Sequence, residues 1–123
     1  MIPLKDDNPT KKKPIVSYCI IGFCVVIFLS QLGLSESELR DFTYSYGLIP
    51  SVLMGIDQLP NDLFKISPVG TIFTSMFMHG GWMHLIGNML YMWIFADNIE
   101  DDLGILNFVI FYLICGIGAA MSQ

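Results

Sequence analysis

Three stretches of the chain carry no charged side chain and are strongly apolar. They are residues 14–35, 66–96 and 103–123. An α-helix rises about 1.5 Å per residue, so each stretch is long enough for a helix that crosses the ~30 Å hydrocarbon core of a bilayer. The pattern therefore predicts an all-α membrane protein with three transmembrane helices, at about residues 15–34, 81–99 and 103–120.

The residues at the ends of these helices fit the prediction. Pro14 suits a first helical turn, Gly80-Gly81 precedes the second helix, and Trp82 and Trp93 are placed for opposite membrane interfaces. A cleaved signal peptide is the alternative for the first helix, because lysines precede it. Its run of about 20 apolar residues exceeds the ~7–15 of a signal peptide, and no small-x-small cleavage site follows, so the sequence favours a retained span.

The basic residues predict the orientation. Arg40 and Lys65 follow the first span, whereas four basic residues precede it: Lys5, Lys11, Lys12 and Lys13. Because Lys and Arg favour the cytoplasmic side of a membrane, we expect residues 1–13 to be a cytoplasmic tail. Residues 35–80 then form a long outer loop, and residues 97–102 form an acidic inner turn.

The predicted outer loop contains an apolar segment, Tyr46 to Gly55. Pro50-Ser51 can open a short helix that Gly55 bounds, so we expect the loop to be partly helical. Such a segment either lies at the membrane interface or packs as a loop without a functional role. Composition leaves both interpretations open.

The overall composition agrees with a membrane protein and excludes other classes. Apolar residues make up 54% of the chain, charged residues 14%, and the mean hydropathy is +0.61. A disordered segment needs the opposite balance, and a small soluble domain cannot bury so many apolar residues. The net charge of -5, with six Lys and Arg, excludes nucleic acid as a partner. The three cysteines lie in apolar runs without CxxC spacing, so they predict neither a disulfide framework nor a metal site.

Polar side chains in and before the second span are the candidate chemistry. His84 and Asn88 are four positions apart and share one helix face, while His79 lies beyond the glycine pair, at the predicted outer mouth. His84 and Asn88 either line a polar pocket open to the outside or form interhelical hydrogen bonds. Two histidines five positions apart, without a third ligand nearby, do not predict a metal site.

These residues belong to a longer pattern. Residues 74–95 read TSMFMHGGWMHLIGNMLYMWIF, and residues 97–104 read DNIEDDLG. Together they resemble the second-helix signature of rhomboid intramembrane serine proteases. Residues 46–55 resemble the first loop of that family and residues 111–116 its third helix, so the likeness covers about residues 14–123. The resemblance implies a partial rhomboid domain: the first three helices of a rhomboid-like bundle.

The resemblance also implies roles for individual residues. His84 and Asn88 match the family residues that donate hydrogen bonds to the oxyanion formed on the scissile carbonyl. His79 belongs to the motif in a supporting role, and Glu100 resembles a family glutamate that ties loops together. The family needs no cofactor, and its substrates are transmembrane proteins in the lipid bilayer.

The catalytic pair of the family is absent from this sequence. Its serine lies in a G-x-S-G motif on the fourth helix and its base on the sixth, yet none of the nine serines here lies in G-x-S-G. We therefore expect an intramembrane serine endopeptidase that lacks its C-terminal helices, so that the chain alone is inactive. The alternative is a non-catalytic rhomboid-like binder or quality-control factor. The short N-terminus and compact core indicate a bacterial inner membrane.

Overall fold

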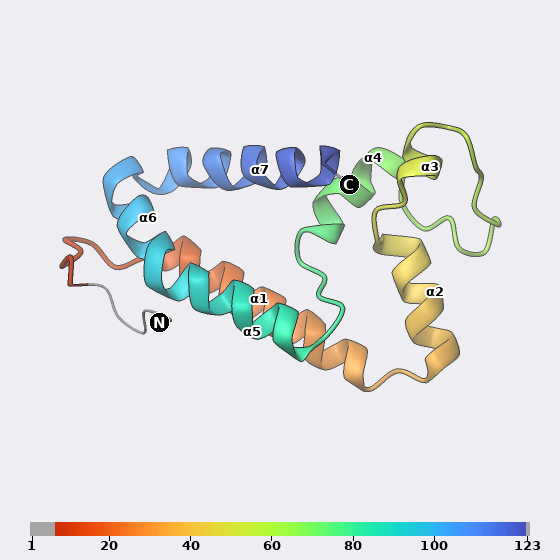
Figure 1. Ribbon diagram of the computed structural model, residues 1–123, viewed down its shortest axis with the longest axis horizontal. Coiled ribbons are helices and arrows are strands. Elements are labelled where there is room, and N and C mark those ends of the chain that lie inside the picture. The colour runs from red at the N-terminus through yellow and green to blue at the C-terminus, as the bar shows by residue number, and fades with distance from the viewer. Residues whose placement is uncertain (1–6, 123) are drawn as a thin grey trace.

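The computed structural model describes residues 7–122, and every regular element among them is helical (Figure 1). Residues 1–6 of the predicted cytoplasmic tail, and Gln123, lie outside the described residues. The elements in chain order are α1 (Ile15–Leu32), α2 (Glu36–Tyr46), α3 (Pro50–Leu53), α4 (Pro68–Ser75), α5 (Trp82–Tyr91), the π-helical turn η1 (Met92–Ala96), α6 (Asp97–Leu103) and α7 (Ile105–Met121).

Helix α1 is the element best suited to a membrane. Within residues 7–122 it alone is both long and apolar enough to cross a bilayer, and only 22% of it is buried inside the protein. A core helix of a soluble protein would be mostly buried. Helix α7 is also apolar but has 17 residues. That the other two predicted spans cross the membrane stays a prediction.

The second predicted helix is longer than the sequence indicated. Elements α5, η1 and α6, of 10, 5 and 7 residues, follow one another without a break and end at Leu103. The expectation of an acidic turn at 97–102 was therefore wrong, because those residues are helical. The turn comes at Gly104, whose φ of 77° lies in the left-handed region that only glycine adopts without strain.

Helices α1 and α5 lie side by side and form the centre of the structure (Figure 1). Cys24 and Phe28 from α1 pack with Leu85 from α5, and all three side chains are buried. The ring of Phe28 meets Trp82 edge-on, with centroids 5.0 Å apart. Helix α7 leaves the α6 corner in another direction, and its far half lies next to α4 (Figure 1).

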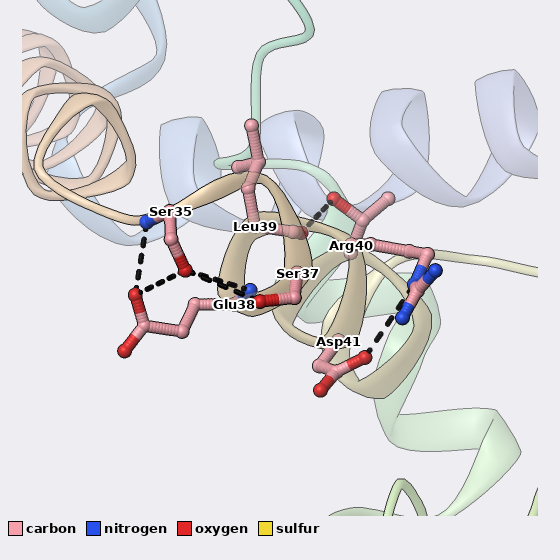
Figure 2. Close-up of polar contacts among 7 residues, drawn as sticks. Ser35, Ser37, Glu38, Leu39, Arg40 and Asp41 are labelled. Atoms are coloured by element: carbon pink, nitrogen blue, oxygen red, sulfur yellow. Dashed lines mark hydrogen bonds and ion pairs between the residues drawn. The ribbon is translucent and has the colours of Figure 1, made fainter.

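A capping box starts α2 directly after α1 ends (Figure 2). Ser35 Oγ accepts a hydrogen bond from the Glu38 backbone N–H at 3.4 Å, and the Glu38 carboxylate accepts one from the Ser35 backbone N–H at 2.9 Å. These bonds satisfy N–H groups that a helix start leaves without partners. The hydrogen bonds from the side chain and the backbone of Ser35 lower the pKa of Glu38.

The predicted outer loop is largely folded. Pro50 is the first residue of the one-turn helix α3, and Gly55 follows it with a φ of 72°, which confirms the short helix expected there. The Thr74 hydroxyl on α4 donates to the carbonyl of Tyr46 at 2.6 Å, so the end of α2 is fixed against α4. Whether the segment touches the membrane interface stays a prediction.

Many large apolar side chains remain exposed on α1 and α7. Val26 is 64% exposed, Leu106 72% and Ile114 62%. Water-soluble monomers rarely present contiguous apolar surface of this extent. The helices therefore present a surface suited to lipid.

Candidate functional site

The polar side chains identified in the second helix converge on one pocket. His84 and Asn88 lie one turn apart on α5, and both line a pocket of about 300 Å³ between α5, the end of α4 and the second half of α7. The other residues that line it are Leu48, Ser75, Met76, Met78, His79, Tyr112, Cys115, Gly116, Ala119 and Ala120. The common face expected for His84 and Asn88 is therefore directed towards a real cavity.

His79 is part of the same cluster. Its Nε2 accepts a hydrogen bond from the Asn88 side-chain amide at 3.2 Å, and its ring lies 5.0 Å from that of His84. The sequence predicted His79 at an open mouth, but the side chain is only 5% exposed. The chain after α4 folds back over the start of α5, which brings His79 against a residue nine positions further on.

The environment of His79 favours its neutral form. Burial lowers the pKa of His79, and the nearby His84 lowers it further, against a smaller opposite effect of the Phe77 backbone. A neutral ring can accept a hydrogen bond at Nε2 while Nδ1 carries the proton. His79 therefore acts as the acceptor that orients the Asn88 amide.

Asn88 and His84 keep donors available for a ligand. The Asn88 amide has two N–H groups, and His79 accepts from one of them. Neither ring nitrogen of His84 has a hydrogen-bond partner within residues 7–122, and both side chains are exposed. The arrangement offers a small negative group two polar contacts from one helix face.

A second, larger cavity adjoins this pocket. It measures about 540 Å³ and lies between α5, η1 and α7. The residues that line both cavities are Met76, His79, Asn88, Tyr112 and Cys115. Its other walls are mainly apolar side chains, including Phe95 and Phe108. Sequence reasoning missed Tyr112 and Cys115, because a phenol and a thiol in an apolar helix look like ordinary packing residues.

Glu100 joins two helices. It is 4% exposed, and its carboxylate accepts hydrogen bonds from the backbone of Val16 at 2.9 Å and Ser17 at 2.8 Å, and from the Ser17 hydroxyl at 2.7 Å. A carboxylate is favourable at a helix N-terminus, where N–H groups lack partners. The resemblance implied that this glutamate ties loops together, whereas here it fixes α6 to the first turn of α1.

The structure shows no cluster of three or more His, Cys, Asp or Glu side chains able to hold a metal ion in its described part. Within that part, the three cysteines are free thiols, and Cys24 is buried in the core.

The protein is thus helical and largely apolar, with a polar pocket beside the continuous helix formed by α5, η1 and α6. Residues 67–123 match the family model of the Rhomboid domain, so this part of the chain is rhomboid domain sequence. The matched segment begins at the residue that caps α4 and contains the whole polar cluster. Rhomboid family proteins are membrane proteins, and the family includes serine proteases. The rhomboid resemblance expected from the sequence is thus confirmed for residues 67–123.

No curated protein matches the chain. No solved structure matches it either. The likeness of residues 14–66 to the family stays a prediction, since the family match begins at residue 67.

Proposed function

We propose that this chain supplies the first three membrane helices of a rhomboid intramembrane serine endopeptidase, and that His84 and Asn88 bind the oxyanion of its reaction. The observation that carries the proposal is their placement. Both lie on one face of α5 beside a pocket, and the buried His79 holds the amide of Asn88. The rhomboid domain match over the same residues supports it.

The proposed chemistry follows from charge development. Attack of a serine hydroxyl on a peptide carbonyl turns the carbonyl oxygen into an oxyanion, and preoriented donors stabilise that charge. The free N–H of Asn88 and a ring N–H of His84 would act as these donors. The orientation of the Asn88 amide is set before the reaction, because His79 accepts its other amide hydrogen.

The nucleophile and the base would come from the helices that complete the domain. The sequence contains no G-x-S-G serine. The cavity of about 540 Å³ between α5 and α7 has apolar walls suited to further helix packing and adjoins Asn88. On this proposal the 123 residues alone have no protease activity, because donors without a nucleophile have no covalent step to stabilise.

The proposed setting is a bacterial inner membrane. The N-terminal tail lies in the cytoplasm and the segment 35–80 outside, as the distribution of lysines favours. The substrates would be transmembrane proteins cleaved within or near the bilayer. The exposed apolar surface of α1 and α7 supports contact with lipid.

A second candidate is a non-catalytic rhomboid-like binder or quality-control factor. Such a factor needs no nucleophile, so the absence of G-x-S-G from residues 1–123 is equally compatible with it. Its apolar cavity would hold a membrane helix without cleavage.

Labelling with a fluorophosphonate probe separates the two candidates. The full-length protein expressed from its gene and purified in detergent should label if it is a serine protease, and heat-denatured protein is the control. The isolated 123-residue chain should not label. Absence of labelling and of substrate cleavage in the well-folded full-length protein would leave the binder as the function.

A further inference from the structure

The backbone before α1 is fixed to the corner between α6 and α7. The backbone N–H groups of Lys11 and Lys12 donate to the two carboxylate oxygens of Asp101, at 2.7 and 3.0 Å. Glu100 binds the first turn of α1 in the same way, through Val16 and Ser17. Two neighbouring carboxylates thus hold the stretch from Lys11 to Ser17 in one position.

The side chains of Lys11, Lys12 and Lys13 form no ion pair within the described residues. Glu100 and Asp101 accept hydrogen bonds from backbone N–H groups instead. Within residues 7–122 the structure has a single ion pair, between Arg40 and Asp41, far along the chain. Because no described acidic side chain pairs with them, the ammonium groups of Lys11, Lys12 and Lys13 can bind an external anion.

A pocket of about 340 Å³ lies where the lysines meet the α6 corner. Its lining includes the basic residues Lys12 and Lys13 and the apolar residues Ile15 and Ile105. Ile15 and Ile105 begin the two apolar helices α1 and α7, and they are 56% and 57% exposed. The pocket thus combines cationic groups with the ends of two apolar surfaces.

We propose that this pocket binds one anionic phospholipid of the cytoplasmic leaflet. Its headgroup phosphate lies against the ammonium groups of Lys12 and Lys13, and an acyl chain follows the exposed apolar side chains from Ile15 and Ile105. The inference rests on the proposed membrane orientation, which puts the tail on the cytoplasmic side. Lysines beside a membrane attract anionic lipids of that leaflet, and long lysine stems reach the headgroup level.

The acidic residues in the pocket wall are compatible with this ligand. Glu100 and Asp101 also line it, but each carboxylate already accepts at least two hydrogen bonds, Glu100 from the first turn of α1 and Asp101 from the backbone just before it. The positive end of the helix dipole offsets part of their charge. Their role in the proposal is to hold the lysines in place.

Thermal unfolding of the full-length protein in neutral detergent tests the proposal. Added phosphatidylglycerol should raise Tm, and phosphatidylcholine with the same acyl chains should raise it less. The double variant Lys12→Gln, Lys13→Gln should lose the difference between the two lipids. The matched control Arg40→Gln, Lys65→Gln removes the same charge from the predicted outer loop and should keep it.

A second pair of variants separates a fixed site from general attraction. Asp101→Ala and Asp102→Ala remove the same charge, but Asp102 makes no hydrogen bond to the tail within the described residues. For a fixed site, Asp101→Ala should weaken the phosphatidylglycerol response and Asp102→Ala should not. If the lysines attract anionic lipid only through their overall charge, both variants should increase the Tm response to phosphatidylglycerol. That result would overturn the proposal.

Two further readings complete the test. Native mass spectrometry should find about one retained phosphatidylglycerol per protein, and none in the Lys12→Gln, Lys13→Gln variant. This measurement does not depend on Tm, so it remains valid if the substitutions themselves change the stability of the protein. An equal Tm rise with glycerol 3-phosphate alone would show a soluble anion as ligand and refute a lipid site. Neither measurement depends on proteolysis. An inactive protein can therefore still show the lipid site, and an active protease can still lack it.

Discussion

The side-chain amide of Asn88 donates a hydrogen bond to Nε2 of His79 at 3.2 Å, which links a buried residue before α5 to an exposed residue within it. The bond needs an unprotonated Nε2. The cluster is therefore sensitive to the protonation of one ring.

Acid should weaken the structure through His79. Because burial and His84 lower its pKa in the folded protein, the unfolded chain binds a proton more readily. The stabilising contribution is fully present above the unfolded value of about 6.5 and is lost as the pH falls through the lowered folded pKa. Tm should thus decrease below about pH 6.5.

The variant His79→Gln isolates this effect, because its side-chain oxygen can still accept from Asn88 and does not titrate. Its Tm should depend less on pH between neutral and mildly acidic conditions than that of the wild type. Parallel pH profiles for the two proteins would show that another group is responsible.

A larger side chain at Gly116 should displace Met76 and lower the stability of the protein. A Cβ at Gly116 would overlap the thioether of Met76, so a β-carbon forces that flexible side chain to move. Gly116→Leu should cost roughly 1–3 kcal/mol of unfolding free energy in detergent, as overpacking does, and Leu113→Ile should cost less. Met76→Ala combined with Gly116→Ala should be less destabilised than the two single changes predict. Additive effects would contradict this contact.

Removal of Glu100 should loosen the start of α1. Its carboxylate accepts three hydrogen bonds from Val16 and Ser17, and a bond to a charged group contributes about 1.5–3 kcal/mol. Glu100→Ala should therefore reduce the unfolding free energy by a few kcal/mol, and Ser17→Ala by less. Hydrogen exchange should show faster exchange at the first turn of α1 in Glu100→Ala. Unchanged exchange there would remove Glu100 as the anchor of α1.

The proposed orientation can be checked with single cysteines. In a background without Cys19, Cys24 and Cys115, an impermeant thiol reagent added to whole cells should label Asp57→Cys but not Asp102→Cys. After the membrane is opened, both should label. If only Asp102→Cys were labelled in intact cells, the orientation would be the opposite of the one proposed.

Much of the fold was predictable because charge and apolar residues separate cleanly along this chain. Helices α1 and α7 lie within two charge-free stretches, and Pro50 and Gly55 mark the short helix α3. The helical residues Asp97 to Leu103 were not predictable in the same way. Their carboxylates look like a solvated turn until backbone N–H groups in α1 and just before it are seen to bind two of them, Glu100 and Asp101.

The candidate site was partly predictable. The four-residue spacing of His84 and Asn88 gave their common face, since that follows from helix geometry alone. The burial of His79 was not predictable, because it depends on how the chain folds back through Gly80 and Gly81. The contact of Asp101 with the tail was not predictable either, because its donors are backbone N–H groups. Backbone donors are the same at every residue except proline, so no sequence pattern predicts such a contact.

The proposed oxyanion role makes a kinetic prediction for the full-length protein. His84→Ala and Asn88→Ala should each lower kcat by about 10²–10³, the usual cost of one oxyanion donor, with little change in KM. Met83→Ala is the control, since Met83 lies on the same helix, is 82% exposed and does not line the pocket. Its kcat should stay near that of the wild type.

Stability must be measured beside activity, because a polar residue removed from a helix bundle can also unfold it. His79→Ala should act in a different way from the two donors: it leaves Asn88 without its acceptor, so it should lower Tm and kcat together. His79→Gln should restore much of both. A well-folded His84→Ala, Asn88→Ala double variant with wild-type kcat would show that this face of α5 serves only interhelical hydrogen bonding.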